Sequence, residues 1–443
     1  MEKVYGMYDI QNKNKKINFS QLAILAFILY IFTQGWLFYL VIQNNFIEIS
    51  VLLVIISTLF LKSLINNLPD LTFTLLDAFW SFSIIVILVL ISISGSGIEE
   101  NDVLIFMYVF GLLFLLLAKT NIDNISLAFT VIKYAAIVYA LNSIFHYFFT
   151  DMYHSLMFPF ISISAQQRVT ELVNLNYYAG LGLSQPSMAA GPMIMGIGIV
   201  LAQLIVGKNQ NKIWNVLLIL LLAISLLIVG KRSVLLWGGV SVVITQLVIS
   251  SDRQKIRKIF KYTLGIIFII GLTYVLWGFL QTIPILTKLV ETIQGIGSGE
   301  DVTSGRTVLY QRAWELFLEN PIFGIGWGQF VVITSGLLSR DLIVHNVYLQ
   351  LLSETGLIGF MIIIIPIIYA YILTIKCYKI IKYNTLINLK WKLGICFSIY
   401  YQTFFLLYCL SENPFYNTVY LFMYFFCLAI MNSLIVLKKS DHL

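Results

Sequence analysis

A histidine and three basic residues in this sequence could carry chemistry together. His345 opens the helical stretch HNVYLQLLSE, and an imidazole, with an unperturbed pKa of about 6.5, can take a proton at neutral pH. Lys231 and Arg232 lie in the short turn GKRS between two apolar runs, and Arg306 opens the helical stretch RTVLYQRAWELFLEN. Basic side chains that converge on one cavity can hold a phosphate or diphosphate. The basic residues are compatible with an anion site beside a base, but a lone histidine in a loop is more often structural than catalytic.

Other polar residues lie at helical spacing from these. Tyr310 shares a helix face with Arg306. After His345 the polar residues fall on one side of an amphipathic helix that we expect to lie along a membrane surface or to cap a cavity: Asn346, Gln350, Ser353 and Glu354. We expect Gly356 to break this helix. Another face of the earlier stretch reads as a solvated ion-pair stripe: Arg312, Glu315 and Glu319.

Motifs for metals, nucleotides and acyl-serine chemistry are missing from the sequence. There is no phosphate-binding loop of the nucleotide type, no HExxH, no GxSxG and no CxxC. The segment GIGWGQF follows Pro321, which predicts a tight turn and not a nucleotide site. The four cysteines are expected to be packing residues. We therefore expect no metal and no cofactor.

The composition places these residues in a membrane protein. Of the 443 residues, 59% are hydrophobic and only 11% are charged, whereas soluble domains carry about 25% charged residues. The net charge of +7 is spread over short clusters between apolar runs, which argues against nucleic acid as a partner. No polar stretch is long enough to fold alone, so residues 1–443 are expected to form a single membrane domain. The predicted fold class is an all-α polytopic membrane protein.

About twelve apolar runs are long enough to cross the bilayer. They lie near 21–42, 48–66, 73–95, 102–118, 134–150, 186–206, 213–229, 234–250, 262–281, 357–376, 393–410 and 416–437. Lysine-rich and arginine-rich segments, such as 251–261 and 376–392, mark the cytoplasmic side, which places both termini in the cytoplasm. Asp77 lies within one run, as either a functional carboxylate or a helix-terminal one.

Two connections on the outer side are too long to be plain turns: 151–185 and 282–356. Loops of this length are usually functional or disordered. The second contains the two helical stretches and the glycine-rich segment, so we expect a large extracytoplasmic loop with short helices. Lysine and arginine are usually concentrated in the cytoplasmic loops of membrane proteins, so basic residues in outer loops are expected to have a function there. Arg168 in the first loop is therefore a further candidate for substrate binding.

The segments SGRTVLYQRAWELFLENPIFGIGWGQF and HNVYLQLLSETGLIGF resemble the O-antigen ligase and O-antigen polymerase superfamily. Upstream, LLIVGKRSVLLW resembles the family's short turn with a central arginine, here Arg232, although Lys231 stands where the family often has serine. Arg306 matches the arginine that opens the family's loop helix. Loop 151–185, together with LSQPSMAAGP, resembles the family's earlier outer loop, and Arg168 is a looser match within it. The resemblance covers residues 220–365.

The resemblance implies a metal-independent glycosyltransferase that polymerises oligosaccharide repeat units linked to undecaprenyl diphosphate. His345 would be the catalytic base, and Lys231, Arg232 and Arg306 would bind the diphosphate, with inversion at the anomeric carbon. Tyr310, Asn346 and Gln350 are candidates for further substrate contacts. The expected location is a bacterial cytoplasmic membrane with the active site outside, and other polysaccharide export proteins are candidate partners.

Two alternatives remain open from the sequence. A ligase would move the same lipid-linked glycan to another acceptor, and residue types do not reveal the acceptor pocket. A transporter or flippase of lipid-linked sugar would carry charged residues along a path within its spans. The expected spans are poor in charge, which favours an enzyme over a transporter.

Overall fold

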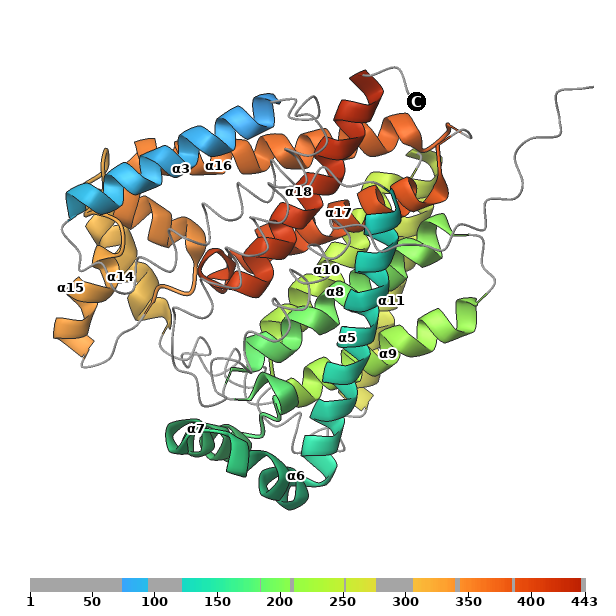
Figure 1. The fold of residues 1–443 in the computed structure, drawn as a ribbon, viewed down its shortest axis with the longest axis horizontal. Coiled ribbons are helices and arrows are strands. Elements are labelled where there is room, and N and C mark those ends of the chain that lie inside the picture. Colours follow the sequence, from blue (N-terminus) through green and yellow to red (C-terminus); the bar gives the residue numbers. More distant parts are fainter. Residues whose placement is uncertain are drawn as a thin grey trace, which may run out of the picture.

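The computed structural model describes residues 74–94, 122–183, 185–207, 211–250, 252–275, 306–338, 343–384 and 387–439. Within these ranges every regular element is a helix and no strand occurs (Figure 1). This agrees with the all-α fold class expected from the composition. The expected spans at 21–42, 48–66 and 102–118 lie outside the described residues.

Five of the described helices are long and apolar enough to cross a membrane. They are α5 (Ile122–Phe148), α8 (Pro186–Val206), α9 (Lys212–Val229), α10 (Arg232–Ile249) and α16 (Val347–Ile381). These five correspond to expected spans. Shorter apolar stretches lie in α3 (Leu75–Ser94) and α18 (Thr418–Lys439), and helices also cover two further expected runs, α11 (Asp252–Val275) and α17 (Leu389–Tyr408). The total of about twelve spans stays a prediction.

The centre of the bundle is formed by α8, α17 and α18. α8 is buried from Ala189 to Ala202 and packs against α5, α9 and α17. α17 packs against α18 through stacked aromatic rings, among them Phe405 on Tyr424 with ring centroids 4.6 Å apart. At the edge of the bundle α3 lies along α16 (Figure 1), where the Ser83 hydroxyl donates to the carbonyl of Ile362 at 2.8 Å. The packing of these helices determines how their ends are placed relative to one another.

Basic residues tie the helix ends together at one end of the bundle. The Lys382 ammonium, just after α16, donates to the carbonyl of Ile249 at the end of α10 at 2.7 Å. Lys392, near the start of α17, donates to the carbonyl of Lys382 at 3.4 Å. At the opposite end lie the α9–α10 turn, the start of α16 and the α17–α18 connection. Within the described residues, α9 and α17 thus run towards this opposite end, and α10 and α16 run away from it.

α16 is broken at Gly356, as its sequence predicts. Gly356 has φ +61° and ψ −170°, a conformation that is essentially restricted to glycine. The break lets the chain around Gly324 approach closely, because a Cβ on either glycine would collide with the other segment's backbone. Backbone amides of Ile325 and Gly326 donate to the carbonyls of Ser353 and Glu354, both at 2.9 Å. The glycine-rich segment is thus the tight turn expected, with positive φ at three of its glycines.

The sequence suggested that the first part of α16 is an amphipathic helix that lies along the membrane surface or caps a cavity, and the structure does not show its polar face turned outward. Its polar side chains face inward: Gln350, Ser353 and Glu354 are buried. The Glu354 carboxylate accepts hydrogen bonds from Gln350 at 3.2 Å and from Tyr416 at 3.4 Å, and also from backbone groups of Gly328 and Phe330. The polar face is therefore used to hold the glycine-rich turn in place.

Both expected outer segments contain short helices. Residues 151–185 include most of α6 (Thr150–Met157), then η1 (Phe158–Phe160), α7 (Ile163–Asn174) and η2 (Gly180–Gly182). The second segment contains α14 (Arg306–Glu319) and α15 (Gln329–Leu338), which flank the glycine-rich turn. The predicted ion-pair stripe is confirmed on α14, where Arg312 lies 3.1 Å from Glu315 and 3.6 Å from Glu319.

Two smaller expectations concern buried side chains. Asp77 is fully buried at the start of α3, where its carboxylate accepts from the backbone amide of Thr74 at 2.7 Å and from Asn432 at 2.9 Å. Of its two expected roles, the structure supports the helix-terminal one. The four cysteines are free and buried, which confirms that they are packing residues.

Candidate active site

Glu412, in the short connection between α17 and α18, joins three of the predicted site residues. Its Oε1 atom lies 3.3 Å from Lys231 Nζ and 3.1 Å from Arg306 Nη2. Its Oε2 atom lies 3.1 Å from Nδ1 of His345. We call these residues, Lys231, Arg306, His345 and Glu412, the Glu412 cluster. Four separate segments of the chain meet in it.

The two cations are held at helix beginnings. α9 ends at Val229 with Gly230 as its C-cap residue, and Lys231 is the N-cap residue of α10. Arg306 is the first residue of α14, and its Nη1 donates to the carbonyl of Ser411 at 2.6 Å. The Ser411 hydroxyl in turn accepts from the indole of Trp237 on α10 at 2.8 Å. The α17–α18 connection is thereby fastened to both cation-bearing helices.

His345 is fixed from several directions immediately before α16. Its φ of +54° is uncommon for a residue other than glycine and costs on the order of 1–3 kcal/mol. The Tyr310 hydroxyl donates to its carbonyl at 3.4 Å, and the next residue, Asn346, caps α16 by accepting from the amide of Leu349 at 3.1 Å. The surrounding contacts thus maintain an unfavourable backbone conformation, which is frequent at functional sites.

The charges around Glu412 keep its carboxylate ionised. Burial alone raises the pKa of this group, but the hydrogen bond from His345 and the charges of Lys231 and Arg306 outweigh it and lower the pKa of Glu412 to about 2. An ionised carboxylate only accepts hydrogen bonds, so Nδ1 of His345 must be the donor. In the neutral ring Nε2 then carries the lone pair. Nε2 of His345 is therefore the ring nitrogen that could accept a proton.

The cluster can also attract an anion. Lys231 and Arg306 bring two positive charges against the one carboxylate of Glu412. A guanidinium has five N–H donors, and the contacts of Arg306 with Ser411 and Glu412 leave others for a ligand. The His345 and Arg306 side chains are each 28% exposed, so a ligand can reach both. Among the described residues no group of three histidine, cysteine or acidic side chains gathers as a metal site.

The other predicted residues are distributed around the cluster. Arg232 follows Lys231 as the first residue of α10, and Tyr310 hydrogen-bonds with Arg306 as well as with His345. Gln350 is buried and bonded to Glu354 and Asn413. Arg168 forms an exposed ion pair with Glu171 on α7 at 2.9 Å, and the described contacts do not join it to the cluster.

Part of the first outer segment reaches the basic turn. The amide of Tyr178 donates to the carbonyl of Ile228 at 3.1 Å, two residues before Gly230. The ring of Tyr177 lies so close to Gly230 that a Cβ at this position would overlap it. The end of segment 151–185 therefore packs against the turn that carries Lys231, which brings both outer segments to the same end of the bundle.

Glu412 was missed by reasoning from sequence. It lies in the connection SENP between two expected spans, which the expected topology places on the same side as His345. An acidic residue in a short connection on the side where several basic residues are expected was the available signal. Pairing it with His345 required the three-dimensional fold, because the two positions share no local motif.

These features define an integral membrane protein with a base, a carboxylate and cations gathered at one end of its helices. Residues 187–364 match the family model described as O-antigen ligase. This match confirms the resemblance to the O-antigen ligase and polymerase superfamily seen in the sequence. The matched region includes Lys231, Arg306 and His345 and ends before Glu412. No curated protein matches the chain.

Proposed function

We propose that this protein is a glycosyltransferase that polymerises oligosaccharide repeat units carried on undecaprenyl diphosphate. The observation that carries the proposal is the Glu412 cluster, in which an oriented histidine lies beside Lys231 and Arg306. A base that faces an anion-binding pair suits transfer of a sugar from a diphosphate leaving group. The O-antigen ligase match agrees with this chemistry.

In the proposed reaction His345 acts as the general base. Its Nε2 atom takes the proton from an acceptor hydroxyl as the hydroxyl oxygen forms a bond to the anomeric carbon of the donor. The bond between that carbon and the diphosphate oxygen breaks, and undecaprenyl diphosphate leaves with the electron pair. Attack from the face opposite the leaving group inverts the anomeric centre. General-base assistance is worth about 10²–10⁴ in rate.

The cations stabilise the leaving group. Arg306, Lys231 and the adjacent Arg232 are proposed to bind the diphosphate, and charge that develops on it in the transition state strengthens these contacts. A guanidinium suits this role because its planar N–H groups match phosphate oxygens in pairs. No step in this scheme needs a metal ion, because the basic side chains supply the positive charge.

Glu412 is proposed as a positioning residue. Its carboxylate orients His345 through Nδ1 and stabilises the imidazolium that forms on proton transfer, as the aspartate does in serine protease triads. The same carboxylate keeps Lys231 and Arg306 directed to one place. The Glu412 side chain thus positions both the base and the cations of the anion site.

The distribution of charge supports an outward-facing site. The cluster lies at the end of the bundle opposite the basic contacts of Lys382 and Lys392. Basic residues concentrate on the cytoplasmic side of membrane proteins. The proposed reaction therefore takes place at the outer leaflet of a bacterial cytoplasmic membrane.

The polymerase assignment is tested by product analysis. Purified protein in lipid vesicles is supplied with a defined repeat unit on undecaprenyl diphosphate, with and without a chelator. A polymerase gives a ladder of lengthening lipid-linked glycan in both conditions. A ligase leaves single repeat units unextended and transfers them only when a second acceptor is added, so this outcome would favour the ligase alternative. Loss of activity with chelator would contradict the metal-independent scheme.

A further inference from the structure

One face of α5 carries exposed apolar side chains along most of its length. α5 is long and apolar enough to cross a membrane, and four of its residues are more than half exposed: Tyr134, Val138, Leu141 and Phe148. Steps of four, three and seven positions keep these residues on one side of a helix. Lipid tails solvate apolar side chains on the outside of a spanning helix, so this stripe is the side of α5 that contacts the bilayer.

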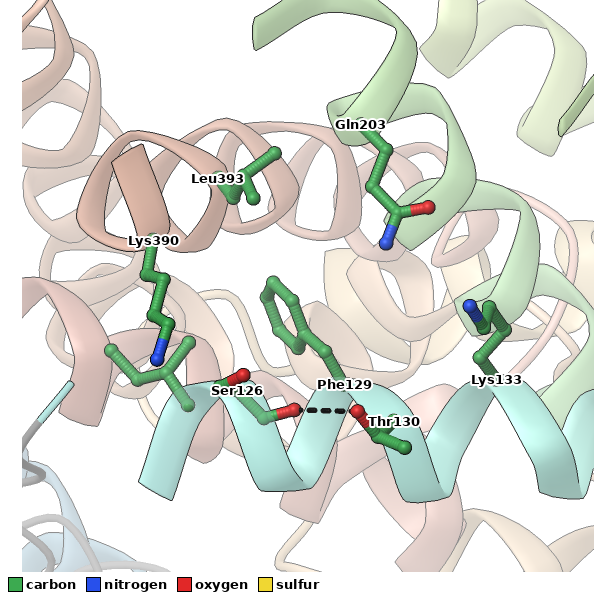
Figure 2. Close-up of a pocket in the computed structure, with 8 residues that line it drawn as sticks. Ser126, Phe129, Thr130, Lys133, Gln203, Lys390 and Leu393 are labelled. Carbon is green, nitrogen blue, oxygen red and sulfur yellow. Dashed lines mark hydrogen bonds between the residues drawn. The ribbon is translucent and has the colours of Figure 1, made fainter. Parts of the chain in front are cut away.

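The two ends of α5 lie at opposite ends of the bundle. In its first half, Ser126 and Lys133 line a pocket together with Lys390 from the first turn of α17, the helix that starts at the basic end (Figure 2). In its last turn, Nδ1 of His146 accepts from the amide of Gly180 at 3.2 Å. Gly180 belongs to the outer segment that packs against the α9–α10 turn. α6, which follows α5, therefore begins at the end of the bundle that carries the Glu412 cluster.

The orientation of α6 is fixed by one buried tyrosine. α5 and α6 are separated by Phe149, whose backbone is not helical. Tyr153 on α6 is 1% exposed, its hydroxyl donates to the carbonyl of Gly180 at 2.6 Å, and its ring stacks on His146 with the centroids 3.9 Å apart. These contacts determine which sides of α6 remain exposed.

The exposed surface of α6 has an apolar side and a polar side. Phe149, Met152 and Leu156 are each more than half exposed and recur at helical spacing. We call these three residues the α6 apolar face. Asp151 and Ser155 are exposed on the neighbouring side. A helix that lies flat at a membrane surface has this arrangement, with acyl chains against one side and water or headgroups against the other.

α7 differs from α6 in what it exposes. After Ile163 its exposed residues are polar: Ser164, Gln167, Arg168, Thr170, Glu171 and Asn174. Its apolar residues Ala165, Val169 and Leu172 are buried. Exposed apolar side chains in this part of the chain are thus concentrated around α6, where they continue directly from the lipid-facing stripe of α5. The outer segment has a side suited to lipid next to a side suited to water.

We infer that α6 lies in the surface of the membrane leaflet at the Glu412 end of the bundle, with the α6 apolar face inserted among the acyl chains. Helices of this kind are buried about 5–10 Å into the boundary between headgroups and acyl chains. The inserted helix anchors one end of the outer segment in lipid. The other end, at Tyr177 and Tyr178, packs against the turn that carries Lys231.

The inference is tested by site-specific fluorescence quenching in the full-length protein. Met152→Cys and Leu156→Cys are labelled with bimane and placed in lipid nanodiscs, which leave both membrane faces open to water. The four native cysteines are buried, and labelled wild-type protein gives the background. We expect doxyl groups near the headgroups to quench both labels more than doxyl groups deep in the acyl chains. Leu141→Cys within the span should show the reverse order, and Ser155→Cys should be quenched several-fold more than Leu156→Cys by aqueous iodide.

Three results would overturn the inference. Iodide quenching at Met152 and Leu156 equal to that at Ser155 would place the α6 apolar face in water. Protection of both labels from iodide and from doxyl lipids would show that protein covers this face. A depth profile like that of Leu141 would place α6 inside the bilayer and not at its surface. If one cysteine variant does not fold, the other decides among the same outcomes, because both residues lie on the same side of α6.

Discussion

Nδ1 of His345 lies 3.1 Å from Oε2 of Glu412, although the two residues are separated by 67 positions in the sequence. One lies before α16 and the other after α17, so the packing of these two helices determines their distance. The backbone amide of Val347 donates to the carbonyl of Cys409 at 2.9 Å and fastens the two segments next to this pair. The histidine and its carboxylate are therefore positioned by the same helix–helix contact.

Replacing Glu412 with glutamine should separate positioning from substrate binding. An amide does not stabilise an imidazolium as a carboxylate does, so we expect Glu412→Gln to lower kcat about 100-fold with a smaller change in KM. Glu412→Asp should restore part of the rate, because it returns the negative charge. Glu315→Gln, which removes an exposed partner of Arg312 on α14, is the control and should keep the wild-type rate. A wild-type kcat in Glu412→Gln would remove Glu412 from the mechanism.

Exchange of arginine for lysine tests the diphosphate contact. Arg306→Lys keeps the charge but loses the planar fork that holds Ser411 and Glu412 together. We expect transfer to fall at least about tenfold, with a raised KM for the lipid-linked donor. Arg312→Lys lies on the same helix in an exposed ion pair and should behave like the wild type. Equal activity of the two variants would argue against an anion-binding role for Arg306.

The stabilising contribution of Glu412 should depend on pH. The pKa of Glu412 is lowered from 4.5 to about 2 in the folded protein, so its contribution is complete above about pH 4.5 and declines as the pH falls towards 2. A shift of this size corresponds to at most about 3 kcal/mol. Thermal unfolding in detergent should show a stability difference between wild type and Glu412→Gln that shrinks as the pH falls below about 4.5. A difference that grows as the pH falls from about 4.5 towards 2 would contradict the assigned ionisation.

The break in α16 should tolerate no side chain. Gly356→Ala places a Cβ against the carbonyl of Ile322 in a backbone conformation that suits only glycine, at a cost of at least about 1–3 kcal/mol. We expect a lower melting temperature and a loss of transfer, because His345 and Gly356 lie at opposite ends of the same short helical segment. Gly239→Ala is the matched control, since nothing lies within 4 Å of a Cβ there. Similar melting temperatures for the two variants would show that the break is not required.

Local signals in the sequence were sufficient for part of the site. Glycine after a polar helical stretch predicted the break at Gly356, and the positions of Lys231, Arg306 and His345 followed from charge placed against the insertion rule and from the family resemblance. Each of these signals is contained within a few neighbouring residues. The structure brings the three side chains to one carboxylate.

The remaining features depended on contacts between distant segments. Glu412 acquires its role only when the α17–α18 connection meets the start of α14 and α16. Gln350 was a candidate for substrate binding, and in the structure it lies buried in contact with Glu354 and Asn413. Periodicity showed that this helix has a polar face, but it did not show that the glycine-rich turn would cover that face.

The most direct test is the initial rate of glycan transfer by His345→Ala with a saturating, defined repeat unit on undecaprenyl diphosphate. His154→Ala serves as a matched variant, because His154 lies on α6 in a stack with Phe158. We expect His345→Ala to fold like the wild type and to lose about 10²–10⁴ in rate, while His154→Ala retains transfer. A folded His345→Ala protein that lengthens the glycan at the wild-type rate would contradict the proposed mechanism.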